Sequence, residues 1–297
     1  MATGILKTRL GFARRYARTA LTDQRHGGCP VAPAPLHPTP EQWPDDRATF
    51  AWLGHATVLA NLYGTWILTD PALETRIGVG QGIAKLGPRR LVAPALRPRD
   101  LPPLDLLLLS HAHMDHTDLG TLRRLSRDVR VIVQPGNRDL VRRFQQVDEL
   151  PWGERTCAGD LEIESVEVKH WGARMITDRH RGYGGYVLRK RGRTILFAGD
   201  TADTDVLAPI GRGSPIDLAI LPIGAYDPWI YNHASPEQAW RMARDMGAAS
   251  VFPVHHSTFR LSREPAEEPI ARLIAAAGPE RQRVAVTRIG ETWVLPE

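Results

Sequence analysis

The sequence predicts an α/β fold in which two mixed β-sheets pack face to face and helices lie outside them, an αββα sandwich. Strand-like and helix-like segments follow one another in the order sheet, helices, sheet, helices, which divides the chain into two halves of similar size. The chain has 297 residues, 42% of them hydrophobic, and a chain of this length can bury about 75% of its unfolded surface. We therefore expect one folded domain over residues 49–297, preceded by a basic and proline-rich segment over residues 1–48.

Short apolar runs bounded by turn residues predict the strands of the first half. Residues 29–44 are rich in proline and should form an extended segment that wraps around the domain. The run Asp105–Leu109 is apolar enough for a strand that is buried on both faces. We also expect strands over Thr49–Leu53, Ala56–Leu62, Thr65–Thr69 and Val129–Val133, and a helix over Leu119–Leu125.

Similar patterns predict the elements of the second half. Residues 161–168 alternate between apolar and polar side chains, but the phase slips within the run, which suggests a β-bulge. Ser235 and Gln238 have the spacing of a capping box, so a helix should begin there. The remaining expectations are a helix over Glu268–Ala277 and strands over Gly185–Leu188, Thr194–Ala198, Leu218–Leu221, Ser250–Val254, Arg283–Val286 and Thr292–Leu295.

Composition and charge narrow the classes of function. The net charge of +5 is spread along the chain without a basic run that holds interleaved aromatics, so we expect no nucleic-acid partner. No segment approaches the roughly 20 apolar residues that cross a bilayer, and the N-terminus lacks the pattern of a secretory signal. The two cysteines, Cys29 and Cys157, lie far apart, which suits a reducing compartment. We expect a cytoplasmic protein, and the sequence leaves its oligomeric state open, a homodimer included.

The basic N-terminal segment, residues 1–28, permits two interpretations. It can form an amphipathic helix that rests on a membrane surface, or a helix with a solvated basic face. Sequence alone favours the second interpretation slightly. Peripheral membrane contact through this segment is expected only with a lipid substrate.

Four potential metal ligands lie close together immediately after the apolar run that ends at Leu109. They are His111, His113, Asp115 and His116. On an extended loop, His111 and His113 can point the same way and bind one ion, whereas Asp115 and His116 can face a second ion. Imidazole nitrogen and carboxylate oxygen are ligands that zinc accepts. A histidine-rich surface loop is the alternative, and the flanking strand and helix argue against it.

This His-x-His-x-Asp-His pattern after a strand resembles that of the metallo-β-lactamase-fold superfamily. The resemblance implies three later ligands at strand ends, and His170, Asp200 and His255 stand at such positions. It further implies that His111, His113 and His170 bind one zinc ion. By the same resemblance, Asp115, His116 and His255 bind the other zinc ion, and Asp200 bridges the two.

Several of these residues also permit a structural interpretation. His170 could be a packed neighbour of Trp171, and Asp200 could cap a turn. His256 competes with His255 for the last position, and we favour His255 with His256 behind it. Two further motif residues have supporting interpretations: His55 orients its own loop, and Asp70 is a hydrogen-bond partner of a ligand histidine. Arg89 and Arg90 can face a phosphate or pair with carboxylates.

Other motifs between residues 49 and 260 resemble the N-acyl-phosphatidylethanolamine phospholipase D branch of this superfamily. They are Trp52-Leu53-Gly54-His55-Ala56-Thr57, Leu68-Thr69-Asp70-Pro71, Gly87-Pro88-Arg89-Arg90, His170-Trp171 with Arg174, and Pro222-Ile223-Gly224-Ala225-Tyr226 followed by His233. Ascorbate-6-phosphate lactonases share some of them. The resemblance implies a hydrolase with two Zn²⁺ per chain, with Mn²⁺ or Fe²⁺ open as substitutes.

The mechanism that the resemblance implies uses a hydroxide between two zinc ions, which lower the pKa of the bound water. Asp115 and Asp200 belong to the catalytic centre, and Asp200 fixes the metal spacing. Arg174, Tyr226 or His233 would stabilise the developing charge or protonate the leaving group. Phosphodiester hydrolysis of a phospholipid is the first expectation. A lactonase that acts on a sugar-phosphate or acyl lactone, and a metal-bound sensor or binding module, are the alternatives.

Overall fold

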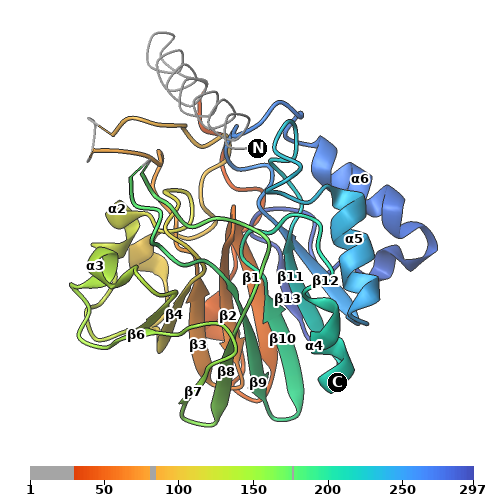
Figure 1. Ribbon diagram of the computed structural model, residues 1–297, viewed down its shortest axis with the longest axis horizontal. Helices are drawn as coiled ribbons and strands as arrows, with labels where there is room; N and C mark the ends of the chain where they lie inside the picture. Colours follow the sequence, from red (N-terminus) through yellow and green to blue (C-terminus); the bar gives the residue numbers. More distant parts are fainter. Residues whose placement is uncertain (1–29, 81–84, 176) are drawn as a thin grey trace.

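The computed structural model describes residues 30–80, 85–175 and 177–297, and these residues form the two mixed sheets that the sequence predicts (Figure 1). The predicted basic segment, residues 1–28, lies outside the described residues. The expected proline-rich wrap is extended from residue 30 except for the 3₁₀ turn Pro40–Gln42. The backbone amide of Ala32 donates to Leu91 and that of Leu36 to Ile289, so this segment contacts two distant parts of the chain.

The first sheet has seven strands, and its central members are buried throughout. Its order is β13 (Thr292–Val294), β1 (Ala48–Gly54), β2 (Thr57–Leu62), β3 (Thr65–Thr69), β4 (Leu106–Leu109), β5 (Arg130–Val133) and β6 (Val147–Glu149). The pairings from β13 to β3 are antiparallel, and those from β3 to β6 are parallel. The four-leucine run in β4 therefore lies near the centre of the sheet, as its apolar sequence predicts.

The second sheet has six strands. Its order is β12 (Ser250–Val254), β11 (Leu218–Pro222), β10 (Arg193–Phe197), β9 (Gly185–Lys190), β8 (Leu161–Val166) and β7 (Arg155–Ala158). The pairings β10–β11 and β11–β12 are parallel, whereas β7–β8, β8–β9 and β9–β10 are antiparallel. Strands β8 and β10 are both antiparallel to β9 and therefore run in the same direction.

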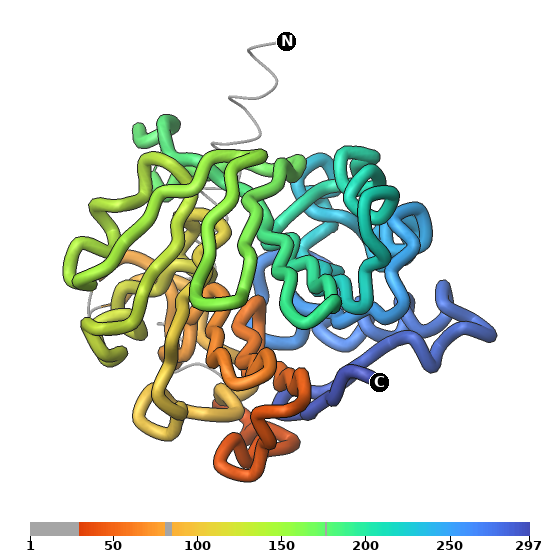
Figure 2. The backbone as a smooth tube through the Cα atoms, turned by 90° about the horizontal axis from the view of Figure 1, so that it is seen from below, coloured from red at the N-terminus to blue at the C-terminus, as the bar shows by residue number. Residues whose placement is uncertain are grey.

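Two hydrophobic clusters hold the layers together. The first contains side chains of both sheets, among them Leu59 and Phe197, and the hydroxyl of the buried Tyr186 donates to the carbonyl of Leu109 at 2.9 Å across it. The second cluster packs the other face of β9–β12 against α5 (Pro236–Asp245) and α6 (Glu268–Ala277). In Figure 2 the orange segments of the first sheet and the green and cyan segments of the second lie as adjacent layers.

The helices lie on the outer sides of this sandwich (Figure 1). They are α2 (Leu119–Leu122), α3 (Arg138–Val141), α4 (Ala208–Gly213), α5 and α6, and the 3₁₀ turns Pro98–Asp100 (η3) and Gly278–Arg283 (η4) lie in the connections. The predicted capping box at α5 is confirmed, because Ser235 and Gln238 each accept from the backbone N–H of the other. None of the helices within the described ranges is long and apolar enough to cross a membrane.

Three predictions about the elements were wrong. The run over residues 161–168 has no bulge, because β8 pairs regularly and ends at Val166, whose side chain joins the second cluster. Helix α2 ends at Leu122, three residues early, and Arg143 donates to the backbone carbonyls of Leu122 and Leu125.

The third error concerns Arg283–Val286, which forms no strand. Arg283 ends the 3₁₀ turn η4, and only Val284 forms a bridge, to Val251. The guanidinium of Arg283 donates to the carbonyls of Ala248 and Ala249, which holds the chain in this turn.

Candidate metal centre

The predicted ligands follow the carboxyl ends of strands that run in the same direction within each sheet. Residues 110–116 follow β4, His170 follows β8, Asp200 follows β10 and His255 follows β12. Because the carboxyl ends of parallel strands meet at one edge of a sheet, these loops can converge. The structure brings all seven predicted ligands together there.

One group consists of His111, His113, His170 and Asp200, whose ligand atoms all lie within 4.8 Å of one another. His113 Nδ1 is 2.8 Å from His111 Nε2 and 3.3 Å from His170 Nε2. Asp200 Oδ2 is 3.9 Å from His111 Nε2 and 3.7 Å from His170 Nε2. These three imidazoles and one carboxylate are the first half of the candidate centre.

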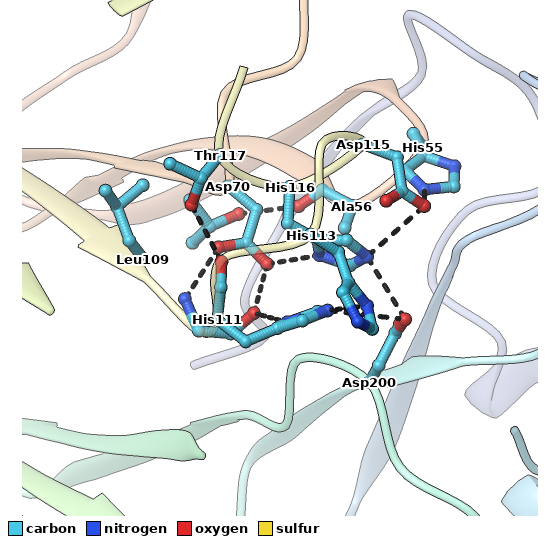
Figure 3. A network of polar contacts seen from close by, with 12 residues as sticks. His55, Ala56, Asp70, Leu109, His111, His113, Asp115, His116, Thr117 and Asp200 are labelled. Atoms are coloured by element: carbon cyan, nitrogen blue, oxygen red, sulfur yellow. Dashed lines mark hydrogen bonds and ion pairs between the residues drawn. The ribbon is translucent and has the colours of Figure 1, made fainter. Parts of the chain in front are cut away.

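The second half combines Asp115, His116 and His255 with Asp200. The Nε2 atoms of His116 and His255 are each 3.2 Å from Asp200 Oδ2, and they lie 3.8 and 3.6 Å from Asp115 Oδ2. Figure 3 shows His116 between Asp70 on one side and Asp115 and Asp200 on the other. Since Asp200 reaches the ligands of both halves, it is the common member of the centre.

Several buried polar atoms of the centre lack a hydrogen-bond partner, as expected of atoms that would ligate a metal ion. Both carboxylate oxygens of Asp200 and the Nε2 atoms of His116 and His255 are buried without a hydrogen-bond partner. Buried polar atoms are normally satisfied, because leaving one unpaired costs roughly 1–3 kcal/mol. Imidazole and carboxylate are the donors that divalent transition metals accept, so the residues present can hold metal ions at both halves.

Burial and neighbouring charges set the protonation of these groups. Burial and the nearby imidazole of His116 hold the pKa of His111 well below its usual value, which leaves the ring neutral and able to ligate. Burial opposes the ionised form of Asp200, but His116, His255 and His233 hold the pKa of this carboxyl well below its usual range. Asp200 is therefore ionised at neutral pH.

Asp70 and Ser110 support the ligand rings from outside the centre. His116 Nδ1 lies 2.6 Å from Asp70 Oδ2, and Ser110 donates to the same carboxylate through its backbone amide at 2.8 Å and its hydroxyl at 2.5 Å. Ser110 Oγ is also 2.9 Å from His111 Nδ1, and the carbonyl of Asn232 is 3.0 Å from His170 Nδ1. Such partners fix the ring orientation of metal-binding histidines.

The three other predicted catalytic residues lie in different surroundings. His233 belongs to the centre, because its Nδ1 is 3.6 Å from Asp200 Oδ2. The Arg174 guanidinium donates to the carbonyls of Ala112 and Thr117 at 2.8 and 2.7 Å and so braces both ends of the ligand loop.

The structure does not bring the Tyr226 hydroxyl to the ligands. This hydroxyl donates to Glu268 Oε1 of α6 at 2.7 Å, and the guanidinium of Arg272 lies 4.8 Å from the ring centroid. Burial and this carboxylate raise the pKa of Tyr226, so the phenol stays protonated.

The structure places the adjacent residues His255 and His256 in different surroundings. It places His255 in the centre, whereas His256 packs against Trp52 with the ring centroids 4.3 Å apart. The guanidinium of the buried Arg90 donates to the backbone carbonyls of Ala72 and Glu74.

The interpretation of His55 as a residue that only orients its loop missed a contact with the centre. His55 Nε2 is 3.0 Å from Asp115 Oδ2, and its ring lies 4.1 Å from that of His255. The glycine before it and its place at the end of β1 were the signals available in the sequence.

Comparison with known proteins agrees with this arrangement. Residues 65–256 match the family model described as a β-lactamase superfamily domain. An uncharacterised protein of Mycobacterium tuberculosis is 33% identical over 88% of this chain and 73% of its own length. The N-acyl-phosphatidylethanolamine-hydrolyzing phospholipase D 1 of Caenorhabditis elegans is 31% identical over 76% of this chain and 68% of its own length.

A solved structure shares the architecture. It is a metallo hydrolase from the archaeon Ignicoccus hospitalis, which superposes with a TM-score of 0.60 at 22% identity. The match covers 84% of this chain and 99% of the archaeal chain. With the family match over residues 65–256 and the converging histidines and aspartates, the chain belongs to the metallo-β-lactamase superfamily as a metal-dependent hydrolase.

Proposed function

We propose that this protein is a dinuclear zinc phosphodiesterase that hydrolyses N-acyl-phosphatidylethanolamine-like lipids with phospholipase D-type cleavage. The observation that carries the proposal is the set of ligands in two halves, with Asp200 Oδ2 also 3.2 Å from the Nε2 atoms of His116 and His255. The similarity to the Caenorhabditis elegans enzyme, at 31% identity over 76% of this chain, supports a phospholipid as the substrate.

The ligand residues form two sets, one for each zinc ion, with one residue common to both. His111, His113 and His170 would hold one zinc ion, Asp115, His116 and His255 would hold the other, and Asp200 would contact both. When bound, the pair of ions supplies Lewis acidity at the phosphoryl oxygen and a nucleophile ionised near neutral pH.

In the proposed reaction, the oxygen of water forms a bond to phosphorus and the bond from phosphorus to the ethanolamine oxygen breaks. The proton of the water ends on that leaving oxygen, and the products are phosphatidic acid and an N-acylethanolamine. His233, whose Nδ1 lies 3.6 Å from Asp200 Oδ2, would donate a ring N–H to a substrate oxygen. Arg174 keeps the ligand loop in place through the carbonyls of Ala112 and Thr117.

Product analysis tests this proposal. Zinc-loaded protein is incubated with N-acyl-phosphatidylethanolamine in mixed micelles, next to the variant Asp200→Ala. Wild type should release phosphatidic acid and N-acylethanolamine, and the variant should release neither because both halves of the centre lose a ligand. Asp205→Ala is the matched control, since the Asp205 side chain is 88% exposed and pairs with Arg241.

The outcomes separate the substrate classes. No turnover by wild-type protein that holds two metal ions would contradict the phospholipase proposal. Hydrolysis of a sugar-phosphate or acyl lactone by the same preparation would then assign a lactonase, whereas inactivity on every ester would favour a metal-bound sensor.

A lipid substrate gives the basic N-terminal segment a proposed role on anionic headgroups. Deletion of residues 1–28 should lower activity on vesicles that contain anionic lipid and spare activity on a small soluble phosphodiester. The ratio of the two rates is the measurement. Equal losses on both substrates would contradict membrane docking by this segment.

A further inference from the structure

His55 lies in the turn between β1 and β2, where its side chain meets the second half of the candidate centre. The residue is 1% exposed, and its Nε2 is 3.0 Å from Asp115 Oδ2. Figure 3 shows the two side chains directed toward each other at the edge of the ligand cluster. The ring also lies 4.1 Å from that of His255 and 5.3 Å from that of His116.

The backbone of His55 forms hydrogen bonds to residues that follow β12, among them the ligand His255 of the second half. Its carbonyl accepts from the backbone N–H of His255 at 3.0 Å and from Trp52 Nε1 at 2.7 Å. Its own N–H donates to Thr258 Oγ1 at 2.6 Å. His55 therefore contacts Asp115, on a loop of the first sheet, with its side chain, and the end of β12, in the second sheet, with its backbone.

The second ring nitrogen distinguishes His55 from three of the ligand histidines. His111, His116 and His170 each place Nδ1 on an outer partner and leave Nε2 for the centre. His55 Nδ1 is buried without a hydrogen-bond partner. With its hydrogen on Nε2, the His55 ring donates to Asp115 Oδ2, which lies 3.0 Å away, and this bond uses one lone pair of the carboxylate.

We propose that His55 is a positioning residue for the second metal ion, because it donates to Asp115 Oδ2 with its side chain and aligns His255 through its backbone. The hydrogen bonds of His55 go to Trp52, Thr258, Asp115 and His255, and none goes to the three histidines that would hold the first metal ion. The inference rests on the proposed metal centre and is independent of the substrate.

Two substitutions separate the side chain from the backbone. His55 has a φ of +54°, a left-handed conformation that asparagine tolerates better than most residues. His55→Asn therefore keeps the turn but is too short to reach Asp115, whereas His55→Gln places an N–H near the position of Nε2. His180→Ala is the control, because His180 is an exposed histidine outside the metal groups.

The measurement is a two-step titration of the metal-free full chain with Zn²⁺, repeated with Co²⁺ to follow the absorption of each site. Loss of an outer partner typically weakens metal binding about 10- to 100-fold. His55→Asn should weaken the second step by this factor and leave the first unchanged, and His55→Gln should recover most of the loss. Thermal unfolding of the metal-free variants checks that each is folded.

Three results would overturn the inference. Unchanged second-step affinity in His55→Asn would show that Asp115 needs no support, and equal weakening of both steps would show a general structural role. A loss in His55→Gln as large as in His55→Asn would make His55 a ligand itself. None of these readouts involves a lipid, so failure of the phospholipase assay leaves them interpretable.

Discussion

The two halves of the metal centre are built differently. The first half contains three imidazoles and takes its outer hydrogen bonds from neutral groups, the Ser110 hydroxyl and the carbonyl of Asn232. In the second half, His116 lies between carboxylates, with Asp70 2.6 Å from Nδ1 and Asp200 3.2 Å from Nε2. Burial lowers the pKa of His116, but Asp200, Asp115 and Asp70 together raise it well above its usual value.

This difference shows two ways to prepare a cation site. The first half relies on neutral rings, of which His111 is oriented by the adjacent Ser110 and His170 by the carbonyl of Asn232, 62 residues away. The second half concentrates negative charge, and its groups, Asp70 included, come from the ends of β3, β4, β10 and β12. We expect the second half to depend more on tertiary contacts, and three substitutions test this.

The largest expected effect comes from Asp70→Asn, which reaches both halves. Asp70 is completely buried and accepts from Ser110 and His116, so the amide would place a donor against a donor. Breaking a buried charged network of this kind costs about 3–5 kcal/mol. Urea unfolding should show this loss, with weaker binding at both metal sites. Asp46→Asn, on the surface, should be neutral, and an unchanged unfolding free energy in Asp70→Asn would contradict the prediction.

Ser110→Ala should affect the first half more than the second. The substitution removes the hydroxyl that lies 2.9 Å from His111 Nδ1 and that donates to Asp70 Oδ2 at 2.5 Å, but the backbone hydrogen bond to Asp70 and the contact between Asp70 and His116 remain. The first metal should bind about 10- to 100-fold more weakly, and the second should change less. Calorimetric titration with Zn²⁺ resolves the two steps, with the exposed Ser126→Ala as the control. A larger loss of Zn²⁺ affinity at the second site than at the first would contradict this prediction.

The smallest effect is expected from Tyr226→Phe, which should leave both halves intact. Its hydroxyl bonds to Glu268, so the loss should be about 1 kcal/mol of unfolding free energy. Metal affinity and turnover should stay at wild-type values. A strong fall in turnover with both metals retained would instead place the Tyr226 hydroxyl on the substrate.

Much of the fold was predictable because its signals are local. The leucine run of β4, the capping box at Ser235 and the extent of α6 each depend on neighbouring residues, and the structure confirms them. The strands β6 and β7 and the helices α3 and α4 were missed. They are short and contain mostly polar or mixed residues, so their sequences carry no clear period.

By itself the sequence determined the two-sheet architecture and the ligand loop, because strand periodicity and the His-x-His-x-Asp-His spacing are properties of adjacent residues. Only the tertiary structure decided that His55 meets Asp115 at 3.0 Å and that Tyr226 meets Glu268 at 2.7 Å. These partners are 60 and 42 residues apart in the chain. Contacts of that kind depend on how the sheets pack and on which way each loop turns, and neither is encoded in local spacing.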